Sequence, residues 1–151
     1  MRKLNLPAYE FKLREVEGKP YVLDMFRKKY VMLTPEEEVR QRFAHYLIRE
    51  KRYPASLVMT EVSMQLNTMS KRCDILVHKP AGKPSVLVEC KAPEVKVTRA
   101  TFDQAARYNM VFKVKYLMVT NGMKHYCCFV DFGQQEVRFM EEIPGYGDLE
   151  P

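Results

Sequence analysis

The chain has 151 residues, of which 25 are lysine or arginine and 19 are aspartate or glutamate, so its formal charge is +6. This length fits one domain, and the modest basic excess is compatible with binding to a phosphate backbone. No apolar run approaches the roughly 18 residues of a membrane span, and the four cysteines contain no C-x-x-C pair, which argues against a zinc site or a disulfide framework. We expect a single cytoplasmic domain over residues 1–151.

The first 31 residues are predicted to form a β-hairpin that extends from the domain. Two alternating runs, 9–16 and 21–25, have the composition of strands. The Glu-Gly-Lys-Pro sequence between them is typical of a turn. We expect this extension, residues 1–31, to have a structural role.

A helix is predicted to follow, from Thr34 to about Lys51. Thr34 has the hydroxyl of an N-cap, Pro35 suits the first helical position, and Glu37 stands where a capping box has its acid. On a helical wheel Glu37 lies at the edge of the apolar arc, whereas Glu38 points well away from it. Glu37 can therefore approach a site that Glu38 cannot.

Three strands are predicted next, and they form an antiparallel meander. The first covers 57–66 and contains Glu61, and the other two, 72–78 and 85–91, are joined by a Pro- and Gly-containing turn at 79–84. Alternation along the last two strands predicts one apolar face, which we expect to pack against a helix. The residues of that face are Cys73, Ile75, Val77, Val86, Val88 and Cys90.

The opposite face of the same hairpin is predicted to carry charged side chains. If the hairpin is symmetric about the middle of its turn, Asp74 lies directly opposite Glu89. Like charges at such a position repel, so a proton, a basic partner or a bound cation must offset them. Lys91, two residues after Glu89, shares its face, and the same register places Arg72 across from Lys91.

A second helix and two further strands complete the predicted core. The helix, 98–112, places Gln104 and Tyr108 one turn apart on the same side. The strands are 115–120 and 125–131, separated by an Asn-Gly turn. A strand that leads through a helix to another strand indicates a right-handed crossover. The predicted fold class is therefore α/β or α+β, with a mixed sheet flanked by helices.

The chain contains five short motifs, in this order: Pro35-Glu36-Glu37-Glu38-Val39-Arg40, Lys71-Arg72-Cys73-Asp74-Ile75, Val88-Glu89-Cys90-Lys91-Ala92-Pro93, Asp103-Gln104-Ala105-Ala106-Arg107-Tyr108 and Thr120-Asn121-Gly122. Their order resembles that of the PD-(D/E)XK nuclease superfamily, with its restriction-endonuclease-like fold. Within it, they are most similar to the N-terminal nuclease domain of type I restriction enzyme R subunits. Cys73 stands where the superfamily has its proline.

This resemblance implies a metal-dependent active site. Asp74 and Glu89 would bind Mg²⁺, or Mn²⁺ in its place, and the Cys90 carbonyl would be a third oxygen ligand. Lys91 would orient or help to deprotonate the attacking water, and Glu37 would hold a metal-bound water. Hydrolysis of a DNA phosphodiester would result.

The resemblance also implies the surroundings of this site. Gln104 and Tyr108 would lie over it and contact DNA, and Arg72 would face a phosphate. Glu61 would support the metal ligands from behind. Residues 35–130 would be the catalytic core and 140–151 an irregular tail.

Alternatives remain at this stage. The chain contains no G-x-x-x-x-G-K-[ST] loop, so we expect an endonuclease domain without a motor domain, whose partners are DNA and a separate motor or specificity subunit. A homodimer is a further option, and no membrane partner is expected. The competing hypothesis is a nuclease-like module that binds DNA or a protein without cutting, and a third is a purely structural domain.

Overall fold

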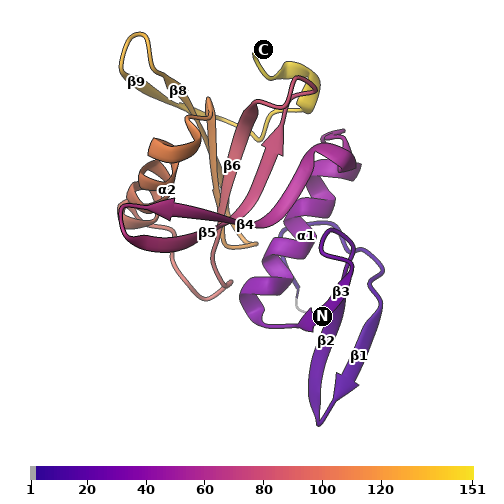
Figure 1. Cartoon of the computed structure of the whole chain (residues 1–151). Coiled ribbons are helices and arrows are strands. Elements are labelled where there is room, and N and C mark those ends of the chain that lie inside the picture. Colours follow the sequence, from indigo (N-terminus) through magenta and orange to yellow (C-terminus); the bar gives the residue numbers. More distant parts are fainter. Residues whose placement is uncertain (1–2) are drawn as a thin grey trace.

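The computed structural model describes residues 3–151 and has two β-sheets and two α-helices (Figure 1). The smaller sheet has the order β1-β2-β3, with β1 Leu13–Val16, β2 Lys19–Asp24 and β3 Lys29–Met32. The larger has the order β4-β5-β6-β7-β8-β9, with β4 Val58–Leu66, β5 Met69–His78, β6 Pro84–Cys90, β7 Tyr116–Thr120, β8 His125–Asp131 and β9 Glu136–Met140. The helices are α1 Pro35–Arg49 and α2 Arg99–Phe112, with short 3-10 helices η1 Ala55–Leu57 and η2 Tyr146–Asp148. The predicted fold class is confirmed.

The large sheet is mixed and lies between the two helices. β6 and β7 are parallel and are connected through α2, as the predicted crossover requires, whereas the other neighbouring strands are antiparallel. Figure 1 shows α1 and α2 on opposite sides of the sheet. Val39, Phe43 and Leu47 of α1 pack on one face, and Ala105 and Tyr108 of α2 on the other. Both faces are therefore covered where the predicted site residues lie.

The predicted register of the central hairpin is confirmed. Ile75 pairs with Val88, and the next two pairs along β5 and β6 keep the same register, before a shift at His78. The ladder between β5 and β6 starts with the pair of Ile75 and Val88, so Asp74 and Glu89 lie just outside this pair.

The prediction that Cys73 shares the apolar face of Ile75 is wrong. Cys73 packs on the α2 side of the sheet, whereas Ile75 packs on the α1 side. The neighbouring strand β4 is irregular at this point, because Glu61 has a φ of 53° and its ladder omits the pair between Glu61 and Asp74. This break in alternation turns Asp74 toward α1.

The N-terminal and C-terminal parts contain more structure than predicted. The hairpin is present, but its first strand begins at Leu13 instead of residue 9, and β3 adds a third strand. Strand β9 was also missed; its Glu-Val-Arg-Phe-Met sequence alternates polar and apolar residues, but its side chains are largely exposed. In the tail, Ile143 and Leu149 are buried against the core. No helix in residues 3–151 is long and apolar enough to cross a membrane.

Candidate active site

Arg40, on α1, joins three acids from different elements. Its Nη1 lies 2.8 Å from Glu37 Oε2, and its Nη2 lies 2.8 Å from Glu61 Oε1 and 2.7 Å from Asp74 Oδ1. Burial alone would lower the pKa of Arg40, but Asp74 and Glu37 outweigh it and raise that pKa. A buried arginine thus neutralises a cluster of carboxylates that would otherwise repel one another.

Glu37 has the helix position that the sequence predicted. Its backbone N–H donates to Thr34 Oγ1 at 3.1 Å, which confirms the N-cap. Its side chain accepts a hydrogen bond from Arg27 Nη2 at 2.6 Å in addition to its contact with Arg40. Arg27 also pairs with Asp24 of β2, so the small sheet is tied directly to the acidic cluster.

Asp74 is buried and both of its carboxylate oxygens have partners. Oδ1 accepts from the Arg40 guanidinium, and Oδ2 accepts from the Cys90 backbone N–H at 2.8 Å. The hydrogen bond from the Cys90 amide fixes Asp74 beside the end of β6, next to Glu89. Cys90 is itself fully buried, and burial raises the pKa of its thiol well above the usual value, so the thiol is not a nucleophile here.

The charge of Glu89 is poorly compensated. It is 4% exposed, Lys91 Nζ lies 3.6 Å from its Oε1, and its Oε2 is buried with no hydrogen-bond partner in the described residues. Burial first, and then Asp74, raise the pKa of Glu89 to about 8, although Lys91 opposes this shift. Glu89 is therefore an acceptor that still requires a proton or a cation.

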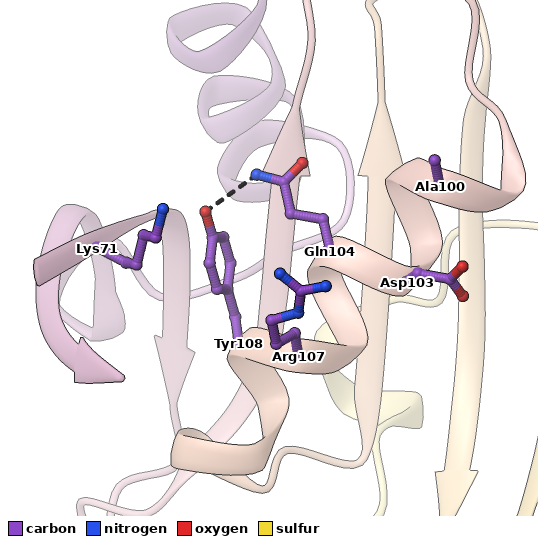
Figure 2. A pocket seen from close by; sticks show the side chains of 6 residues that line it. All are labelled: Lys71, Ala100, Asp103, Gln104, Arg107 and Tyr108. Carbon is purple, nitrogen blue, oxygen red and sulfur yellow. Dashed lines mark hydrogen bonds between the residues drawn. The ribbon is translucent and has the colours of Figure 1, made fainter. Parts of the chain in front are cut away.

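Lys91 connects Glu89 to α2. Its Nζ donates to Gln104 Oε1 at 3.0 Å. Gln104 Nε2 in turn donates to the Tyr108 hydroxyl at 3.0 Å (Figure 2). The predicted pairing of Gln104 and Tyr108 on one side of the helix thus places them in a chain of hydrogen bonds that ends at Lys91, the ion-pair partner of Glu89.

Arg72 does not lie across from Lys91, because the ladder between β5 and β6 does not extend that far. Arg72 pairs with Ser63 of β4, and its Nη1 lies 3.5 Å from Glu61 Oε2. Its side chain is 69% exposed, so it remains available to a ligand. Glu61 is linked to both Arg72 and Arg40, and Arg40 in turn contacts Asp74.

Two residues of the cluster were missed in the sequence. Arg40 stands three positions after Glu37, a spacing that signals a helical ion pair and could have been noticed. Glu36 is half-buried, and burial together with Asp74 raises its pKa, while Arg40 and Lys91 lower it. Glu38, as expected, lies elsewhere and contacts Arg42 at 3.3 Å.

Comparison with known proteins places the chain in a family. The sequence model described as "Type I restriction enzyme R protein N terminus (HSDR_N)" matches residues 35–144, which include the whole cluster around Arg40 and Glu89. The chain belongs to the HSDR_N family. A search of curated proteins found no match.

A solved structure supports the fold of this HSDR_N domain. It is a fragment described as the HsdR subunit of a type I restriction enzyme from Vibrio vulnificus YJ016, with 18% sequence identity and a TM-score of 0.56. The match covers 78% of the present chain and 24% of the other. The chain therefore spans about a quarter of the length of that structure.

The residues of this HSDR_N domain fit a hard divalent cation at Glu89. Such cations prefer carboxylate and water oxygens, and Glu89 Oε2 is a buried carboxylate oxygen without a partner. Asp74 would contribute lone pairs that Arg40 and the Cys90 amide leave free. Within residues 3–151 no three His, Cys, Asp or Glu side chains form a group that could hold a metal ion by themselves.

Proposed function

We propose that this HSDR_N domain is a metal-dependent DNA endonuclease of the PD-(D/E)XK type. The observation that carries the proposal is the uncompensated oxygen of Glu89, which lies beside Lys91 and Asp74 and is connected through Lys91 to Gln104 and Tyr108. A domain that only binds DNA gains nothing from a buried carboxyl group without a partner, because such a group costs stability.

Asp74, Glu89 and the Cys90 carbonyl would hold Mg²⁺, or Mn²⁺ in its place. When bound, the metal would polarise the scissile phosphate and stabilise the charge that develops on it. Arg40 keeps Asp74 in place through the hydrogen bond to Oδ1, and Glu37 and Glu61 in turn hold Arg40.

Lys91 is the residue that orients the attacking water. Gln104 accepts a hydrogen bond from its Nζ, which fixes the ammonium group close to Glu89 instead of leaving it free to rotate. From this position Lys91 orients the water and stabilises negative charge on the phosphate. Tyr108 and Gln104, on α2, and the exposed Arg72 on β5 would contact the DNA strand.

The domain would act in the cytoplasm with the other subunits of a type I restriction enzyme, including a motor and a specificity subunit, or as a homodimer. A second candidate function is a nuclease-like module that binds DNA or a protein without cutting it, and the pairing of Asp74 with Arg40 favours this alternative.

A cleavage assay separates the two candidates. Supercoiled plasmid and a linear single strand are incubated with the protein in Mg²⁺, Mn²⁺ or EDTA, and Glu89→Gln serves as a variant of the same shape. We expect cleavage that needs metal and falls about 10²-fold or more in Glu89→Gln, because the variant lacks the charge that holds the metal. Binding of DNA without cleavage in any metal would favour the non-catalytic module.

A further inference from the structure

A cleft lies beside the candidate active site, between α2 and the start of β5. Its volume is about 380 Å³, and it is lined by Lys71, Ala100, Asp103, Gln104, Arg107 and Tyr108. Gln104 and Tyr108 belong to the chain of hydrogen bonds that ends at Lys91, the ion-pair partner of Glu89, so the cleft has a fixed position relative to the acids. The charged residues of the cleft, Lys71, Asp103 and Arg107, have no role in the proposed cleavage chemistry.

Two cations of this cleft lack partners. Neither the Lys71 amine nor the Arg107 guanidinium makes an ion pair or a side-chain hydrogen bond in the part of the chain that the structure describes. Figure 2 shows their cationic ends near Tyr108, on either side of its ring, while the carboxylate of Asp103 points away from them. The cleft therefore presents positive charge that its own acid does not neutralise.

The Tyr108 hydroxyl adds a neutral donor to the two cations. Its oxygen accepts the hydrogen bond from Gln104 Nε2, and no other partner of this oxygen is present among the described residues. The proton of the hydroxyl is therefore free to be donated into the cleft. Two cations and one O–H donor around a small cleft suit an oxyanion with several acceptor oxygens.

We propose that Lys71, Arg107 and the Tyr108 hydroxyl form a binding site for one phosphate of the DNA backbone. This inference rests on the proposed nuclease function, and it adds a second phosphate contact beside the one that would be cut. The site reads the backbone and not a base, so it holds a strand in register without selecting a sequence. Gln104 links the two sites, because it bonds to Lys91 on one side and to Tyr108 on the other.

The test is DNA binding in EDTA, where no cleavage can occur. Fluorescence anisotropy is measured with a labelled duplex and a labelled single strand of the same length, for the unmodified protein, Lys71→Gln, Arg107→Gln and the double variant. We expect each single change to weaken binding by about five-fold or more on any sequence. The slope of log affinity against log salt should become shallower by about 0.9 for the duplex per lost contact.

Two control variants remove equal charge far from the cleft. Lys19→Gln, on β2, and Arg52→Gln, after α1, should change affinity by less than about two-fold. Lys71→Arg should retain most of the binding, since it keeps the charge.

Equal losses in the control and cleft variants, or no measurable DNA binding by the unmodified protein, would overturn the inference. Failure of the nuclease proposal gives a different result. If DNA binding in EDTA is intact but no DNA is cleaved in the presence of metal, the nuclease proposal fails and this phosphate site stands. Cleavage that continues with unchanged KM in the double variant would reject the site and keep the nuclease.

Discussion

Replacing Arg40 with methionine is expected to lower the free energy of unfolding by about 3–5 kcal/mol at pH 8. Methionine fills a similar volume but leaves Glu37, Glu61 and Asp74 without the guanidinium that they share. Removing one partner of a buried ion pair is costly because the other charges stay buried without compensation. Urea unfolding, followed by circular dichroism in EDTA, measures the change.

The cost of Arg40→Met should depend on pH. When folding crowds uncompensated carboxylates, the folded state binds more protons than the unfolded state, so stability falls as pH rises and recovers as pH is lowered. The difference between the two proteins should therefore be largest near pH 8 and smaller near pH 5. Arg49→Met, at the exposed end of the same helix, should cost under about 1 kcal/mol at any pH. If Arg40→Met lowers the free energy of unfolding by under about 1 kcal/mol, or by the same amount at every pH, Arg40 does not hold the cluster together.

Lys91→Ala is expected to reduce the rate of DNA cleavage by about 10²–10⁴-fold at saturating metal, while the protein remains folded. The change removes the ammonium group that Gln104 positions next to Glu89. It also removes the cation that opposes the upward shift of the Glu89 pKa, so binding of metal near pH 7 should weaken. Single-turnover cleavage in high Mn²⁺, at pH 7 and pH 9, separates the two effects.

Restored metal binding at pH 9 without restored cleavage would identify Lys91 as part of the chemistry. Lys83→Ala, in the exposed turn between β5 and β6, is the matched control and should cleave at the normal rate. If Lys91→Ala regains full activity at pH 9, the lysine acts only by keeping Glu89 charged.

Local patterns in the sequence were sufficient to predict most of the central hairpin. Ile75 and Val88 are paired as expected, and Gln104 and Tyr108 share a side because helical spacing requires it. The parallel pairing of β6 with β7 follows from the crossover through α2.

The partners of the charged side chains could not be predicted in the same way. The expectation was that Lys91 and Arg72 would offset the repulsion between Asp74 and Glu89, yet Asp74 is paired with Arg40, which lies 34 positions earlier. A contact of that kind depends on how α1 packs on the sheet and on the irregular β4 at Glu61, neither of which leaves a periodic signal.

The short exposed strands were missed for a related reason. β3 has no clear alternation between apolar and polar residues, whereas β9 does alternate but leaves its apolar Val137 and Phe139 exposed. Backbone pairing with β2 and β8 defines these strands, and such pairing is not visible in composition.

Calorimetric titration of Mn²⁺ into the metal-free protein at pH 7, in two buffers with different ionisation enthalpies, addresses the site at Glu89 directly. The raised pKa of about 8 means that Glu89 is mostly protonated at pH 7, whereas a metal ligand must be deprotonated. We expect saturable binding that releases about one proton per ion, an affinity that rises as pH increases through 8, and loss of this binding in Glu89→Gln. Binding that releases no proton and persists in Glu89→Gln would place the metal elsewhere, and no saturable binding would contradict a metal-dependent site.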